Sequence, residues 1–75
     1  MKFMIDVILP ADVAQEVCEY SVSYVEEATS SAEAIRAAAV KARERFGISA
    51  STPLNVPMAW AVMPSGLQEV FGLVA

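Results

Sequence analysis

Apolar and polar side chains alternate along residues 2–9, and a period of two is typical of a β-strand with one buried face. We expect this strand to stop at Pro10, because proline lacks a backbone donor and the nearby Asp12 favours a turn. The residues up to 16 then form a connection with room for one helical turn. One face of the strand carries Phe3, Ile5, Val7 and Leu9, and the other carries Lys2, Met4, Asp6 and Ile8.

The alternation resumes over residues 18–25, where β-branched and aromatic side chains favour a second strand, antiparallel to the first. Its aromatic residues are expected to pack under a helix. One side of this strand carries Cys18, Tyr20, Val22 and Tyr24, and the other carries Glu19, Ser21, Ser23 and Val25.

A helix is predicted from Ser30 to about Phe46. Ser30 and Glu33 have the spacing of a capping box, in which each side chain accepts a hydrogen bond from the other residue's free backbone N–H. Gly47 suits the left-handed conformation that ends many helices. One stripe of the helix is apolar but mostly alanine, so the helix can approach a sheet closely. The stripe consists of Ile35, Ala38, Ala39, Ala42 and Phe46.

A third alternation, over residues 56–63, predicts a third strand. Pro57 cannot donate to a sheet ladder, so this strand should be an edge strand or begin as one. After a turn at residues 64–66, apolar residues recur at helical spacing and predict a short C-terminal helix, with a fourth strand as the alternative. The two sides of the third strand are Val56, Met58, Trp60 and Val62 against Pro57, Ala59, Ala61 and Met63, and the predicted helix carries Leu67, Val70, Phe71 and Val74.

These elements predict a single small α+β domain over residues 1–75 with the order β-β-α-β. A crossover through the helix would place the third strand beside the first, which gives a three-stranded, antiparallel-type sheet of order 2-1-3. The helix would pack on one face of that sheet. The first strand is then central.

The composition adds two constraints. Hydrophobic residues make up 56% of the chain and charged residues only 19%, so disorder is excluded and some apolar surface is expected to meet another molecule. The net charge of -4 has the wrong sign for a protein that neutralises phosphates, so we expect no direct nucleic-acid binding. A single cysteine and the lack of a leader or a long apolar run indicate a cytoplasmic protein without a membrane span.

No residue pattern indicates catalysis, a metal or a cofactor. The chain has no histidine, and its three glycines are isolated. Cys18 has no activating partner and is expected to be a small buried residue. Glu26 and Glu27 point to opposite faces of a strand, whereas Asp6 and Glu19 could be neighbours across the first hairpin as solvated surface charges. We therefore predict a protein that is not an enzyme.

The sheet face opposite the helix is the remaining unexplained surface. It is predicted to carry Met4, Ile8, Val25, Ala59, Ala61 and Met63, and an uncovered apolar face that bears methionines is typical of an interaction surface. The alternatives are that the C-terminal helix folds over this face, that a partner protein uses it, or that a homodimer does so. The predicted protein-binding residues are Met4, Asp6, Ile8, Glu19, Val25 and Met63.

The stretch from Val22 to Ile35, which reads VSYVEEATSSAEAI, resembles a pattern that recurs in small phage-encoded proteins. Similar β-β-α-β layouts occur in the podophage inhibitors of host RNA polymerase and in several anti-CRISPR proteins, and the start of the chain also looks like antitoxins with a partial RNase H-like fold. The resemblance implies a viral inhibitor that occupies a surface on a host protein or complex in the host cytoplasm. The competing expectation is an assembly module that acts through self-association.

Overall fold

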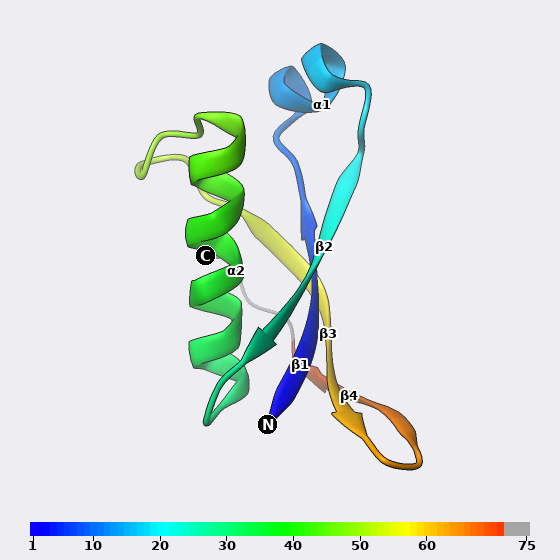
Figure 1. The fold of residues 1–75 in the computed structure, drawn as a ribbon. Helices are drawn as coiled ribbons and strands as arrows, with labels where there is room; N and C mark the ends of the chain where they lie inside the picture. The colour runs from blue at the N-terminus through cyan, green and yellow to red at the C-terminus, as the bar shows by residue number, and fades with distance from the viewer. Residues whose placement is uncertain (72–75) are drawn as a thin grey trace.

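The computed structural model describes residues 1–71, and the side chains of residues 1–69. Four strands form one sheet, and the longer of two helices lies against it (Figure 1). The elements in chain order are β1 (Lys2–Ile8), α1 (Ala11–Val17), β2 (Ser21–Glu27), α2 (Ser31–Phe46), β3 (Asn55–Met63) and β4 (Gly66–Phe71).

The sheet has the order β2-β1-β3-β4, and every neighbouring pair is antiparallel. The predicted α+β class and the order 2-1-3 are therefore confirmed, with a fourth strand added beyond β3. β1 pairs with β2 on one side and with β3 on the other, so it is an interior strand along its whole length. Because both edges of β1 are hydrogen-bonded, the registers of β2 and β3 are both set by their pairing with β1.

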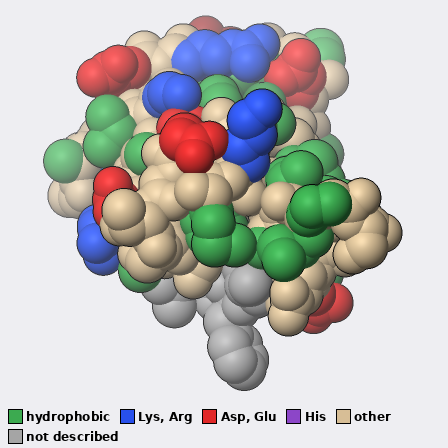
Figure 2. Space-filling model, turned by 60° about the horizontal axis from the view of Figure 1, so that its bottom comes forward, with side chains coloured by type: hydrophobic (Ala, Val, Ile, Leu, Met, Phe, Trp, Pro, Cys, Tyr) green, Lys and Arg blue, Asp and Glu red, His purple; other side chains and the backbone are tan. Residues whose placement is uncertain are grey.

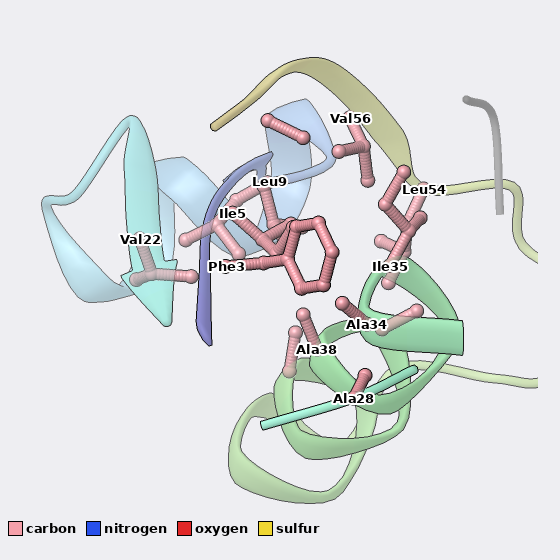
Figure 3. Close-up of a cluster of buried hydrophobic side chains, with 14 of the residues drawn as sticks. Phe3, Ile5, Leu9, Val22, Ala28, Ala34, Ile35, Ala38, Leu54 and Val56 are labelled. Atoms are coloured by element: carbon pink, nitrogen blue, oxygen red, sulfur yellow. The ribbon is translucent and has the colours of Figure 1, made fainter. Parts of the chain in front are cut away.

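The core lies between the sheet and α2. The predicted inner residues of β1 are all buried, and Figure 3 shows the Phe3 ring pointing toward Ala34, Ile35 and Ala38 of α2. Alanine dominates the buried stripe of the helix, so the α2 backbone can approach the sheet closely while larger side chains of the sheet fill the space. Ile48 and Leu54, from the connection after α2, are also buried in this cluster.

The predicted start and end of α2 are confirmed, but the predicted capping box forms only in its Ser30 half, because the Glu33 side chain bonds the Thr29 hydroxyl and not the Ser30 N–H. The Ser30 hydroxyl oxygen accepts a hydrogen bond from the Glu33 backbone N–H at 3.2 Å, while the Glu33 carboxylate accepts one from the Thr29 hydroxyl at 2.6 Å. At the other end Gly47 has a φ of 64°, in the left-handed region, and the Ile48 N–H bonds the Arg43 carbonyl at 3.0 Å. The Arg43 guanidinium donates to the Thr52 carbonyl at 2.7 Å and holds the following loop against the helix.

The segment before β2 differs from the prediction. Residues 11–17 form helix α1, and Cys18 ends it in a left-handed conformation with its side chain exposed rather than buried. Strand β2 starts only at Ser21, because β1 ends at Ile8 and the pairing continues beyond it only through the Leu9 N–H, which donates to the Tyr20 carbonyl at 3.1 Å. As a result Tyr20 is 73% exposed and does not pack under a helix. Tyr24, in the paired part of β2, does pack against the core.

Strand β3 contains an irregularity that the sequence alternation did not predict. Asp6 pairs with Met58 and Ile8 pairs with Asn55, so Val56 and Pro57 together oppose one residue of β1. This extra residue is a β-bulge, and it reverses the faces of everything after it. Ala59 and Ala61 are buried under α2, whereas Met58, Trp60 and Val62 lie on the opposite face, so the predicted sides of this strand were wrong beyond the bulge.

The predicted C-terminal helix was also wrong within the described residues. Residues 66–71 form β4, the alternative, which extends the sheet as a hairpin with β3. Gly66 has a φ of 131°, a conformation that favours glycine, directly after the turn at Pro64 and Ser65. A helix of about ten residues, as predicted, is marginal on its own, and the free edge of β3 offers backbone partners that a helix would not use. Val74, the last predicted helical residue, lies outside the described residues.

One charged side chain is buried beside the core. Glu26 is only 6% exposed because it lies on the helix-facing side of β2, and its Oε2 atom is 2.8 Å from the Lys41 Nζ atom on α2. The neighbouring Glu27 is exposed and its Oε1 atom is 3.0 Å from the N-terminal amine of Met1. The two carboxylates therefore point to opposite faces, as the strand period predicts, and have separate partners.

We expect the Ser30→Ala variant to lose about 1 kcal/mol of unfolding free energy, because the Glu33 N–H at the start of α2 loses its acceptor. Chemical denaturation followed by circular dichroism measures the loss. Ser31→Ala, one residue inside the helix, is the matched control and should be close to neutral. Equal stability of the two variants would show that the cap makes no net contribution.

We expect the Lys41→Ala variant to lose about 1–2 kcal/mol, because Glu26 would keep a buried carboxylate without its cationic partner. The half-exposed position of Lys41 keeps the loss below that of a fully buried pair. Arg36→Ala, at an exposed position of the same helix, is the control and should cost much less. An unfolding midpoint that falls equally in both variants would contradict the importance of this pair.

Candidate protein-binding face of the sheet

The sheet face opposite α2, called here the outer face, is built from three cross-strand rows. The Lys2 row contains Glu27, Lys2, Val62 and Leu67, in the order β2, β1, β3, β4. The Met4 row contains Val25, Met4, Trp60 and Glu69. The Asp6 row contains Ser23, Asp6 and Met58, and Ile8 lies one step further along β1.

The centre of the outer face is apolar and open. Val25 is 61% exposed, Leu67 is 53% exposed and Val62 is 40% exposed, while Met4 and Trp60 are half-buried by their neighbours. Figure 2 shows hydrophobic side chains gathered on the side of the molecule where Figure 1 places the β3–β4 hairpin. Three of the four strands thus contribute large exposed apolar side chains to one continuous surface.

Charged and hydroxyl side chains occupy fixed places around this apolar centre. Lys2 lies directly opposite Glu27 on the neighbouring strand, and the Ser23 hydroxyl donates a hydrogen bond to Asp6. Opposite charges in cross-strand positions attract each other, and the serine bond holds the carboxylate of Asp6 in place. Along β1 the face therefore has a positive group on one side of the Met4 row and a negative group on the other.

Four of the six predicted binding residues are brought together by the fold. Met4, Asp6, Ile8 and Val25 share the outer face, in agreement with the alternation in β1 and β2. Glu19 does not join them and is not a neighbour of Asp6, because it precedes the first residue of β2. Met63 is two residues after the buried Ala61, so the alternation of β3 puts it on the side of the sheet that faces α2, next to the β3–β4 turn.

Sequence reasoning missed three large side chains of this face and misplaced two small ones. Met58, Trp60 and Val62 are on the outer face, whereas Ala59 and Ala61 are buried. The available signal was Pro57, because a proline inside a strand is confined to edges or bulges. In β3, Pro57 lies in the bulge. The described pairs between β3 and β4 begin at Met58, so Pro57 has no partner on β4 among them.

A pocket, a metal site or a membrane-spanning helix among the described residues would indicate a different function. Exposed Cys18 lines a shallow, open hollow together with Ala14, Gln15, Glu19 and Tyr20. Among residues 1–71, no group of three potential metal-ligating side chains lies together. The helices of this same region include none that is long and apolar enough to cross a membrane.

Comparison of the chain with protein-family models, with curated proteins and with solved structures finds no match. The function is therefore inferred from the geometry of the outer face.

We expect no salt-sensitive binding to DNA or RNA at micromolar protein concentration. The net charge is -4, and three of the five basic residues are already engaged, Lys41 with Glu26, Arg43 with loop carbonyls and Arg45 with the Phe46 ring. Fluorescence titration of labelled single- and double-stranded oligonucleotides at low salt tests this expectation. Binding that weakens steeply as salt rises would contradict it, since that dependence reports phosphate contacts.

Proposed function

We propose that this chain is a non-catalytic protein that acts by binding another protein through its outer face. The observation that carries this proposal is that three strands each expose a large apolar side chain on one face, in two adjacent cross-strand rows: Val25, Val62 and Leu67. Contiguous apolar surface of this kind is unusual on an isolated soluble domain and is typical of an interface. Its charged neighbours would set the orientation of the partner more than the strength of binding.

The make-up of the outer face supports an interface over a chance exposure. Trp60 and the methionines Met4 and Met58 lie at its centre, and aromatic residues and methionine are enriched in interface cores. A half-buried tryptophan that is already held by its neighbours loses little conformational freedom on binding. Lys2, Asp6 and Glu69 lie around these residues and supply a polar rim.

The partner that we propose is a host protein or complex, in the host cytoplasm. This part of the proposal comes from the resemblance of residues 22–35 to small phage-encoded inhibitors, which act by covering a surface of a host protein. A domain of this size can do so without an active site, since one open sheet face is enough to occupy a complementary surface. Self-association through the same face is the second candidate.

We expect Val62→Asp to reduce partner capture at least tenfold, because it replaces an exposed apolar side chain between Lys2 and Leu67 with a carboxylate that a partner would have to desolvate. The measurement is affinity capture from a bacterial lysate with the tagged chain, followed by quantitative mass spectrometry. Val40→Asp is the matched control: it makes the same change at an exposed valine on α2, away from the sheet.

Retention of every captured protein by Val62→Asp, with the fold intact by circular dichroism, would show that the binding surface lies elsewhere. Loss of the same proteins with Val40→Asp alone would move the surface to α2. Ile8→Asp, at the end of the outer face, should have an intermediate effect because fewer apolar neighbours surround it.

A further inference from the structure

The two charges that β1 places on the outer face lie at equal distances from the Met4 row, on opposite sides of it. Lys2 lies two residues before Met4 on β1, and Asp6 lies two residues after it, with all three on the same face. At about 3.3 Å per residue each charge is about 6.6 Å from the Met4 row, in opposite directions. A rotation by 180° about an axis that runs across the strands along this row exchanges the two positions.

We propose that, in the absence of a target, the outer face is covered by a second copy of this chain, stacked face to face about that two-fold axis. The proposal rests on the proposed function in so far as both use the outer face as the binding surface. In this arrangement each strand lies antiparallel over the same strand of the other copy. Lys2 of each copy then faces Asp6 of the other, so two opposite-charge pairs form.

The apolar side chains also match under this rotation. The Lys2 row of one copy faces the Asp6 row of the other, which places Val62 against Met58. The Met4 row faces itself, so Met4 meets Met4 and Trp60 meets Trp60 at the centre. Glu69, at the β4 end of that row, faces Glu69 of the other copy, but it lies on the rim, where water and salt screen the repulsion.

A two-fold axis along the strands is unfavourable by the same reasoning. If that axis follows β1, Lys2 faces Lys2 and Asp6 faces Asp6, so like charges oppose each other. If it runs between β1 and β3, Lys2 faces Val62 and Asp6 faces Met58, so each charge is buried against an apolar side chain. Only the axis across the strands pairs every charge of β1 with an opposite one.

The dimensions of the sheet set the expected strength of the pairing. Four strands about 4.8 Å apart, with six to nine residues each, present a face of about 400 Å², and two such faces bury on the order of 800–1,000 Å². This area is below that of stable complexes and corresponds to a weak dimer, with Kd on the order of micromolar to tens of micromolar. Stacked sheets are about 10 Å apart, which is within the combined reach of a lysine and an aspartate side chain.

Sedimentation velocity of the full chain from about 2 to 500 µM tests the pairing, since a weak dimer gives a concentration-dependent average mass over this range. Lys2→Glu and Asp6→Lys, each alone, should weaken the dimer at least tenfold, because each opposes like charges across the interface. The double variant Lys2→Glu with Asp6→Lys should restore it. Within one chain the double variant still lacks the Asp6–Ser23 bond and still has a carboxylate at position 2 opposite Glu27. If the single variants weakened the dimer only by disturbing the fold of each chain, the double variant would therefore stay weak.

Cross-linking gives a second, independent test of the axis. In a Cys18→Ser background, Met4→Cys should react with a short bifunctional thiol reagent to form a covalent dimer, since residue 4 faces itself across the axis. Glu44→Cys, on the exposed side of α2, is the control and should give no dimer above background.

A wild-type chain that stays monomeric over the whole range would overturn the proposal. So would a dimer that both single charge variants leave unchanged, which would place the contact elsewhere, for example at the free edge of β2. Failure of the double variant to recover, with its fold intact, would reject this axis. None of these results depends on capture of a host protein, so the function proposed above would stand or fall by its own test.

Discussion

The rest of the structure depends on the close packing of α2 against β1. β1 is hydrogen-bonded on both sides, and its inner side chains, Phe3, Ile5 and Val7, are almost completely buried beneath the alanine stripe of the helix. A strand held in this way cannot slip by one residue without moving every apolar side chain out of the core. The strict alternation of β1 therefore decides which residues are inside and which form the outer face.

The outer face is a consequence of having one long helix for a four-stranded sheet. α2 contacts β1, β2 and β3, and the short helix α1 adds Val13 and Ala14 at the margin of the same core. Among the described residues no second layer lies over the other side of the sheet. A chain of 75 residues buries a smaller share of its surface than a larger domain does, so apolar side chains remain available for binding.

The bulge in β3 decides which side chains this open face carries. Without the extra residue at Val56 and Pro57, Ala59 and Ala61 would be on the outer face, and Trp60 would be directed at the helix. There the indole would be too large for the close approach that the alanines of α2 allow. The bulge thus places small residues where the helix is close and large ones where a partner can reach them, which links the packing of the core to the composition of the surface.

The sequence by itself determined the elements whose signals are local. The period of two in β1, the Ser30 cap and the Gly47 stop act within a few residues, so they predicted the central strand, the bounds of α2 and four of the six residues assigned to the outer face. Tertiary structure decided the start of β2, the exposure of Cys18, the reversal of faces in β3 and the conversion of the predicted C-terminal helix into β4. These features depend on which backbone groups find partners on a neighbouring strand, and that information lies in residues far away along the chain. The charge symmetry of Lys2 and Asp6 about Met4 is present in the sequence, but it became a candidate interface only when the fold left that face of β1 uncovered.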